Sequence, residues 1–238
     1  MVPVYITCQI FEDDPDTPFT LHRFRAAPNH TNQAAGATVW GKESTQDHLF
    51  TSSEPRGDEN AMEDTATGYH YAWDARRGRK AFDLDAKEPG NASEISPDGS
   101  ILALITGAPP GLHPLRLYDV RRRIRKAYAR EELEPYSERS SSSYNPDDHS
   151  GLLEHARFSP DGRLLAVTRG DNRLHVYDIR VLSRGPLCRF EHCDSDVGGG
   201  RAYGVVEAQW VEGRDRRRIG IVSGGNDGWS RLHLLQML

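Results

Sequence analysis

Two groups of residues in the C-terminal half carry side chains that could do chemistry. His192, Ser223 and Asp227 have the residue types of a base, a nucleophile and an orienting carboxylate, the set used by serine hydrolases. Cys188, His192 and Cys193 are types that bind zinc, but zinc sites use four ligands in spaced pairs, and an adjacent His and Cys fit that spacing poorly. The chain has no P-loop, G-x-S-x-G or H-E-x-x-H motif. We therefore expect no catalytic residue, no metal and no cofactor.

The elements that must position these residues repeat along the chain. ISPDGSILAL at 95–104 and FSPDGRLLAV at 158–167 are near copies, and each leads into a second matched segment, LRLYDVRRR at 115–123 or LHVYDIRVL at 174–182. Partial copies are YAWDARRGRK at 71–80 and IGIVSGGNDGWSRLHLL at 219–235, where the aromatic–Asp pair is eroded to His233-Leu234. Matched segments that recur in the same order along the chain indicate a repeat architecture.

One unit shows why its residues recur. Pro160 presets φ for a tight turn, Asp161 can accept hydrogen bonds from the turn backbone, and Gly162 supplies a positive φ. The apolar run 164–167 predicts a strand buried on both faces, and the alternating RLHVYD that ends at Asp178 predicts the next strand. With one strand before the turn and a weaker one after, each unit has four antiparallel strands, as does the blade of a β-propeller.

These units resemble WD40 repeats over about 37–238. The motifs that carry the resemblance are SPDG before an apolar strand and an aromatic–Asp dipeptide that ends a later strand. The resemblance implies structural roles for Trp73, Asp74, Asp98, Gly99, Tyr118, Asp119, Asp161, Gly162, Thr168, Asp171, Tyr177, Asp178, Ser223 and Asp227. It also implies a hydrogen-bonded brace of His, Ser or Thr, turn Asp and Trp in each blade. Thr168, Asp171 and Tyr177 supply one such set, and His192, Ser223 and Asp227 supply another in which His233 replaces the Trp, so these Ser and His residues are assigned to bracing and not to catalysis.

The predicted fold is a single all-β domain, a WD40-like β-propeller of four-stranded antiparallel blades that is incomplete or irregularly closed. We assign a partial blade to 1–36, blade A to 37–86, blade B to 92–128, a polar Ser-rich and acidic insertion to 129–152, blade C to 153–191, and blade D, lacking its outer strand, to 203–238. About four and a half blades are few for a WD40-type ring. Three explanations stay open: the sequence is part of a longer propeller, the N-terminal strand closes blade D, or a partner chain completes the ring.

Composition limits the class of protein. The 238 residues contain 30 Lys+Arg and 35 Asp+Glu, a net charge of −5, which excludes a globally basic nucleic-acid binder. No run of about 18 apolar residues is present, and no secretory signal is recognisable, so we expect no membrane partner. Three cysteines are an odd number for a disulfide framework and fit a reducing cytoplasmic or nuclear location.

Blade topology divides the charges between two faces. The c–d turns of blades A and B and the a–b turn of blade D are rich in Arg and share one predicted face, whereas the loop 54–64, the insertion and the segment 191–196 place acids on the other. The residues predicted to bind a partner are Arg76, Arg77, Arg121, Arg122, Arg123, Arg216 and Arg217. Each face could steer an oppositely charged partner. The alternative is that these are ordinary solvated turns, and nucleic acid is an unlikely ligand because no stacking aromatics accompany the arginines.

The resemblance implies a non-catalytic scaffold of WD40 type that binds other proteins inside the cell. Two alternatives remain. One is a substrate-receptor or chromatin-associated subunit of a larger complex. The other is the propeller part of a prolyl-oligopeptidase-like enzyme, which would need an α/β-hydrolase domain.

Overall fold

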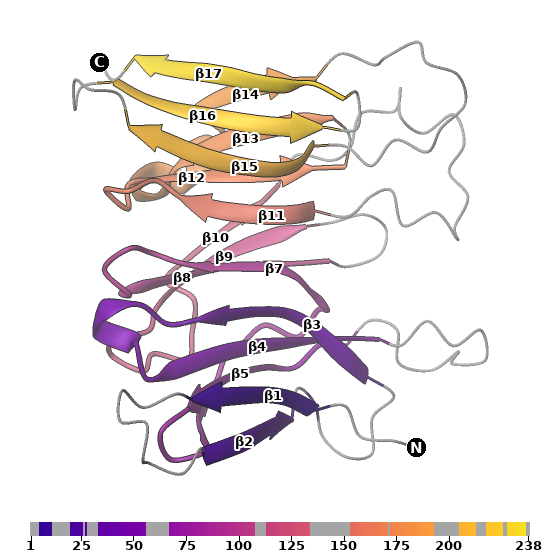
Figure 1. The fold of residues 1–238 in the computed structure, drawn as a ribbon, viewed down its shortest axis with the longest axis vertical. Coiled ribbons are helices and arrows are strands. Elements are labelled where there is room, and N and C mark those ends of the chain that lie inside the picture. Colours follow the sequence, from indigo (N-terminus) through magenta and orange to yellow (C-terminus); the bar gives the residue numbers. More distant parts are fainter. Residues whose placement is uncertain are drawn as a thin grey trace.

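The computed structural model describes residues 5–10, 20–25, 27, 33–55, 67–107, 113–133, 153–170, 172–192, 205–212, 218–225 and 228–236. These residues form five antiparallel sheets, of which three have four strands, one has three and one has two (Figure 1). In each sheet, strands that follow one another in sequence are also neighbours in the sheet. This up-and-down order is that of a propeller blade, so the predicted all-β propeller fold is confirmed.

The strands of each blade are called a to d in chain order. Blade A holds β3 (Gln33–Trp40), β4 (His48–Pro55), β5 (His70–Asp74) and β6 (Arg79–Asp83). Blade B holds β7 (Gly90–Ile95), β8 (Ile101–Thr106), β9 (Pro114–Asp119) and β10 (Ala129–Glu132). Blade C holds β11 (Leu153–Phe158), β12 (Leu164–Arg169), β13 (Arg173–Asp178) and β14 (Cys188–Glu191). Blade D holds β15 (Val205–Glu212), β16 (Arg218–Gly225) and β17 (Ser230–Gln236), and two short 3₁₀ helices, η1 (Glu43–Thr45) and η4 (Ile179–Arg184), lie in connections.

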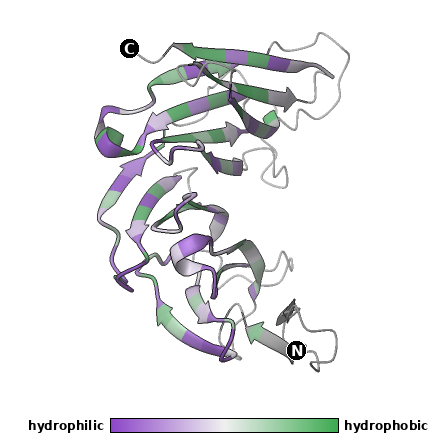
Figure 2. Cartoon of the chain, turned by 60° about the vertical axis from the view of Figure 1, so that its left-hand side comes forward, coloured by the Kyte–Doolittle hydropathy of each residue, from purple (hydrophilic) through white to green (hydrophobic). Residues whose placement is uncertain are grey.

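The blades stand side by side along an open arc (Figure 2). The a strands β3, β7, β11 and β15 are neighbours in that order, so they line the inner side of the arc. At the N-terminal end, β1 (Tyr5–Ile10) pairs with β2 (Thr20–Arg25) in a sheet of its own, and Phe24 packs against Leu49 and Trp73 of blade A. Among the described residues β17 has no fourth strand beside it, and β1 is paired elsewhere. The structure therefore differs from the alternative in which the N-terminal strand closes blade D.

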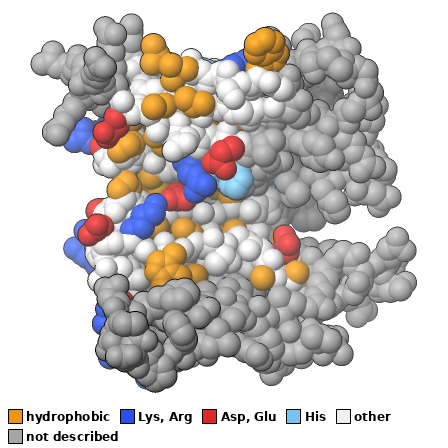
Figure 3. Space-filling view, in the orientation of Figure 1, with side chains coloured by type: hydrophobic (Ala, Val, Ile, Leu, Met, Phe, Trp, Pro, Cys, Tyr) orange, Lys and Arg blue, Asp and Glu red, His pale blue; other side chains and the backbone are white. Residues whose placement is uncertain are grey.

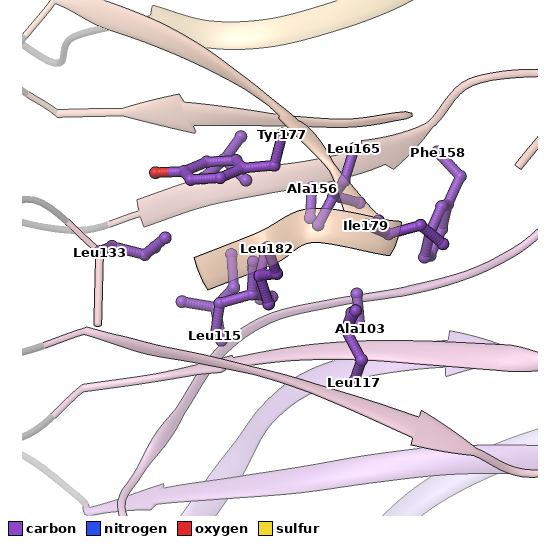
Figure 4. Close-up of a cluster of buried hydrophobic side chains, with 13 residues drawn as sticks. Ala103, Leu115, Leu117, Leu133, Ala156, Phe158, Leu165, Tyr177, Ile179 and Leu182 are labelled. Atoms are coloured by element: carbon purple, nitrogen blue, oxygen red, sulfur yellow. The ribbon is translucent and has the colours of Figure 1, made fainter. Parts of the chain in front are cut away.

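The b strands of blades B and C, β8 and β12, are mostly apolar because neighbouring blades cover both of their faces. In β8, Leu102 and Leu104 pack toward blade A, while Ala103 and Ile105 pack toward blade C. The cluster between blades B and C also contains Leu165 of β12 and is shown in Figure 4. Each blade is thus stabilised mainly by burial against its neighbours.

The predicted boundaries need three corrections. Residues 33–36, which the sequence placed in the partial blade, belong to β3 of blade A, and residues 90–91, which it left between blades A and B, begin β7. Residues 129–132, which the sequence placed in the polar insertion, form β10, the outer strand of blade B. This strand has no apolar alternation because it borders solvent: Ala129 and Glu131 are half-buried, and Arg130 and Glu132 are exposed. The rest of the insertion lies outside the described residues.

Candidate interaction surfaces

The a–b and c–d connections of blades A, B and C meet at one end of the sheets. In each of these blades the first residue of the c–d connection donates a backbone hydrogen bond to the a–b connection: Ala75 to Asp47 at 2.8 Å, Val120 to Ser100 at 3.0 Å and Ile179 to Arg163 at 3.1 Å. We call this the turn end, made of residues 41–47, 75–78, 96–100, 120–128, 159–163 and 179–187, and the opposite end the loop end. The predicted partner-binding residues of blades A and B lie at the turn end, and Arg216 and Arg217 lie outside the described residues.

The two SPDG turns are built alike. Asp98 Oδ1 accepts from Ser96 Oγ at 2.6 Å and from the Ser100 amide at 3.1 Å, and Asp161 Oδ1 accepts from Ser159 Oγ at 2.6 Å and from the Arg163 amide at 3.1 Å. Partial burial opposes ionisation of Asp98, but these hydrogen bonds outweigh it and lower its pKa. Gly99 and Gly162 both have φ of +70°, the left-handed conformation that favours glycine. All four residues therefore shape turns.

The aspartates that end the c strands hold cations of the following turn. Asp178 accepts from the Arg180 amide at 3.0 Å and from its guanidinium at 2.9 and 2.6 Å. Asp74 accepts from the Arg77 amide at 3.0 Å and from its Nη1 at 3.2 Å, and Asp119 lies 3.4 Å from Arg121 Nη2. The hydrogen bonds from Arg180 lower the pKa of Asp178, so this carboxylate stays ionised.

These contacts divide the predicted partner-binding arginines. Arg76 is paired with Asp47 at 2.7 Å, Arg77 with Asp74, and Arg121 and Arg122 with Asp119. Arg123, whose φ is +53°, makes no ion pair within the part of the chain that the structure describes. Paired surface cations contribute less to an external field than free ones. The prediction from sequence did not distinguish the paired arginines from Arg123.

The aromatic residues that precede the strand-end aspartates of blades A, B and C hydrogen-bond to different partners. Trp73 Nε1 donates to Thr51 Oγ1 at 3.0 Å, Tyr118 OH donates to Asp85 Oδ1 at 2.9 Å, and Tyr177 OH lies 3.3 Å from His175 Nδ1. Burial is the largest reason that the pKa of Tyr118 is raised, so this hydroxyl stays a donor. Sequence analysis missed Thr51, although a β-strand places it on the same face as Leu49, the register partner of Trp73.

In blade D, His192, Ser223 and His233 come together as the brace required. His192 Nε2 and His233 Nε2 lie 2.8 and 2.9 Å from Ser223 Oγ, and Arg231 Nη1 lies 2.6 Å from His192 Nδ1. Arginine can only donate, so His192 Nδ1 accepts, its Nε2–H donates to Ser223, and the Ser223 hydroxyl donates to His233. Ser223 is 1% exposed, so this serine is enclosed by the brace.

The brace predicted for blade C is wrong in its Thr168 member. Tyr177 is the register partner of Leu165, and both pack toward blade B. Thr168 is three residues from Leu165 on the same strand, so its side chain lies on the opposite face, and its hydroxyl accepts from the His155 amide at 2.9 Å. Asp171 and Asp227, the predicted turn members of the two braces, lie outside the described residues.

Two buried histidines stand toward the loop end. His70 Nε2 lies 2.8 Å from the Glu88 carbonyl, so it donates, and Nδ1 lies 2.9 Å from Ser52 Oγ. Burial lowers the pKa of His70 to about 4, and burial, with Arg169 nearby, lowers that of His113 to about 4. Both are neutral at physiological pH.

A ladder of charges crosses the inner strands, and sequence analysis did not find it. Glu94 accepts from Lys42 of the blade A turn at 2.7 Å and from Arg157 of β11 at 2.9 Å, and Arg157 continues to Glu207 of β15 at 3.4 Å. Charged side chains gather in the middle of the inner face in Figure 3. Glu94 and Arg157 each lie two residues before an SPDG motif. Opposite charges at the same position of two neighbouring repeats could have predicted this ion pair from the sequence.

The outer face of blade D is apolar and exposed. The c-strand residue just before the aromatic position pairs with a residue of the neighbouring b strand. These register pairs are Phe50–Ala72 in blade A, Ala103–Leu117 in blade B, Ala166–Val176 in blade C and Val222–Leu232 in blade D. The first three pairs are buried beneath the next blade. Val222 and Leu232 are 38% and 60% exposed, and neighbouring Leu234 is 65% exposed.

The described residues form no metal site and no membrane-spanning helix. Within the described ranges no three His, Cys, Asp or Glu side chains are grouped to hold a metal ion, and Cys193 lies outside those ranges. Burial raises the pKa of the Cys188 thiol, which opposes thiolate formation there. No described helix has the length and apolar character needed to cross a membrane.

Comparison with known proteins supports the fold. No protein-family model matches the chain, and no curated protein matches it. Among solved structures, a Dos1 propeller superposes with a TM-score of 0.60 at 16% sequence identity, covering 84% of this chain and 43% of that one. The chain therefore spans less than half the length of this structural relative. The likeness, with the sheet order above, establishes a β-propeller fold.

Proposed function

We propose that this chain is a non-catalytic scaffold of WD40 type whose blade ends bind other proteins. The single observation that carries the proposal is the arrangement of the turn end. Three blades packed through continuous apolar clusters hold their a–b and c–d connections together there, and the connections carry exposed Arg and Lys side chains. A rigid scaffold with charged loops reduces the entropy lost on binding.

The enclosed Ser–His set supports a non-catalytic assignment. Ser223 is 1% exposed, and its hydroxyl accepts a hydrogen bond from His192 and donates one to His233. A nucleophile must reach a substrate carbonyl and must have a base that is free to take its proton. His233 Nε2 accepts the Ser223 proton, but the buried hydroxyl cannot reach a substrate, and His192 is held as an acceptor from Arg231 and as a donor to Ser223. This geometry suits a brace between blades C and D.

The test is identification of a direct partner by quantitative affinity purification of the tagged chain from cells, followed by binding of the purified candidate to the purified chain. We expect saturable binding that is weakened by charge substitutions at one end of the blades and unchanged by equal substitutions at the other. Absence of any candidate that binds directly would contradict the scaffold function. So would turnover of an ester or peptide substrate that is abolished by Ser223→Ala.

A further inference from the structure

We infer that the outer face of blade D binds a second copy of this chain, and that each copy uses this same face. We call this surface the D face and define it by the exposed apolar residues of β15, β16 and β17 that point away from blade C, at the end of the arc (Figure 1): Val211, Val222, Leu232 and Leu234. The inference goes beyond the proposed scaffold function and does not depend on it.

The four side chains of the D face form one continuous patch. In the register of blade D, Gly220 lies between Val211 and Leu234 in one row across the sheet, and Val222 lies beside Leu232 in the next row. A Cβ placed on Gly220 would lie 3.2 Å from Leu232 Cδ1 and 3.4 Å from Leu234 Cδ2, so the two leucines lean over the glycine and meet there. The patch therefore extends over all three strands of the blade.

The alternation of β17 is the reverse of what a sheet with one wet face shows. His233 stacks on Phe190 of blade C, with ring centroids 4.2 Å apart, and Arg231 points the same way. Leu232 and Leu234 point outward and are 60% and 65% exposed. A sheet with one face in water places polar residues on that face and apolar residues inside. The pattern of β17 is instead that of a sheet covered on both faces.

The equivalent faces of the other blades show what kind of surface covers such a face. The Phe50–Ala72 pair of blade A lies beneath blade B, and the Ala103–Leu117 pair of blade B lies beneath blade C. In both places most of the covering side chains come from the sheet of the next blade. Sheets pack face to face through interdigitating apolar side chains. A second sheet is therefore the partner that fits the D face.

In a second copy, the described sheet face that is free for this contact is the D face itself. Continuing the order of the blades, the D face would meet the aromatic face of another blade, but the aromatic faces of blades B, C and D already lie against blades A, B and C. The aromatic face of blade A is covered by β2, where the rings of Phe24 and Trp73 lie 5.4 Å apart. Within the described part of the chain, a head-to-tail contact is therefore obstructed. A contact between two identical faces is isologous and closes at two copies.

The charge of the D face also suits a contact with itself. An isologous contact brings identical groups together, so an ionisable side chain near its centre would face a like charge. The two register rows of the face, Gln209–Val222–Leu232 and Val211–Gly220–Leu234, contain no ionisable side chain. A charged partner would thus find no opposite charge here. The net charge of −5 makes two copies repel one another at a distance, so added salt should strengthen the contact by screening.

The first test is sedimentation velocity of the full chain at increasing protein and salt concentrations. We expect a weak monomer–dimer equilibrium that strengthens with salt, because four apolar residues a side are few beside the about 20–30 of a standard interface. Leu232→Lys/Leu234→Lys and Leu232→Glu/Leu234→Glu should each raise the dissociation constant more than about tenfold. The matched control is Leu187→Lys in the blade C connection, where Leu187 is 61% exposed against 60% for Leu232, and this variant should dimerise like the unmodified chain.

The second test mixes the two double variants and distinguishes a same-face contact from any other. In the mixture a face with two lysines can meet a face with two glutamates, so we expect a one-to-one heterodimer in native mass spectrometry that weakens as salt rises. Both variants stay net acidic, because two added charges are fewer than the five excess acids of the unmodified chain. Attraction between whole molecules therefore cannot produce the heterodimer. Circular dichroism and thermal melting check that both variants are folded.

Four results would overturn the inference. They are a chain that stays monomeric up to about 100 μM, a series of oligomers larger than the dimer, association that Leu187→Lys weakens as much as the double variants do, and folded double variants that fail to pair when mixed. The proposed scaffold function is tested with a different protein as the partner, so it stands or fails separately from these results.

Discussion

Acidification should destabilise the fold through histidines that are buried in the neutral form. His70 is nearly inaccessible, its Nε2–H donates to the Glu88 carbonyl and its Nδ1 faces Ser52. His113 is also buried, with the cation of Arg169 close enough to oppose a second positive charge. Lowering the pH from 7 to 5 protonates these imidazoles readily in the unfolded chain but not in the folded one.

The magnitude follows from the two pKa values. Each histidine titrates near 6.5 when unfolded and at about 4 when folded. Between these values the unfolded state binds more protons, so stability is full above pH 6.5 and is lost progressively as the pH falls toward 4. At pH 5 the loss is about 2 kcal/mol for each histidine, or about 4 kcal/mol for both. That is a large part of a typical domain stability of about 5–15 kcal/mol.

The assay is urea unfolding followed by tryptophan fluorescence at pH 7, 6 and 5, with the free energy of unfolding extrapolated to water. His70→Gln keeps an amide donor for the Glu88 carbonyl but cannot titrate, so its loss between pH 7 and 5 should be about 2 kcal/mol smaller than that of the unmodified chain. His155→Gln, at a half-exposed histidine, controls for removing an imidazole. A pH dependence of His70→Gln equal to that of the unmodified chain would refute the reasoning.

Three further predictions concern packing and charge. Gly99→Ala and Gly162→Ala introduce the same strain at φ +70°, about 1–2 kcal/mol, but the new Cβ meets the Lys42 carbonyl at 1.8 Å in the first and only Pro97 Cδ at 3.5 Å in the second, so thermal denaturation should show the larger loss for Gly99→Ala. Equal losses would contradict the blade A–blade B contact. Glu94→Gln should cost about 1.5 kcal/mol, because a neutral amide replaces the buried carboxylate that accepts from Lys42 and Arg157, although both cations keep access to water. Glu207→Gln at a half-exposed site should cost under about 1 kcal/mol. Chemical denaturation distinguishes them, and a reversed order would exclude a stabilising role for the ladder. The exposed Leu232 and Leu234 predict concentration-dependent self-association in sedimentation velocity, which Leu232→Lys/Leu234→Lys should reduce without lowering the melting temperature; a chain that stays monomeric, or association that the variant leaves unchanged, would contradict this.

The local features of the repeat could be predicted from sequence because their partners are close along the chain. Asp98 and Asp161 bond to residues two positions away, and Gly99 and Gly162 adopt the positive φ that their turns require. The b strands of blades B and C were equally clear, because burial on both faces leaves an uninterrupted apolar run. These features fixed the fold class.

The predictions that failed concern the face of a strand on which a residue lies, an outer strand, or contacts between blades. Thr168 was chosen by residue type, although counting from Leu165 places it on the other face of the sheet from Tyr177. β10 was missed because an outer strand bordering solvent need not alternate. The Lys42–Glu94–Arg157 ladder joins three blades, so no single repeat contains it.

The number of arginines in a connection does not predict how many cations are unpaired at the turn end, because this depends on the length of each c–d connection. The connection of blade A is a tight turn with Gly78 at φ +58°, and Arg76 and Arg77 therefore stay beside Asp47 and Asp74. The connections of blades B and C are longer and extend beyond their strand-end aspartates. The aspartate that ends the c strand of blades A, B and C thus stabilises a short turn and neutralises its cations, whereas a longer connection leaves cations free. Since blades A, B and C carry the same aspartate, differences in binding between these three blades should follow connection length more closely than the number of arginines.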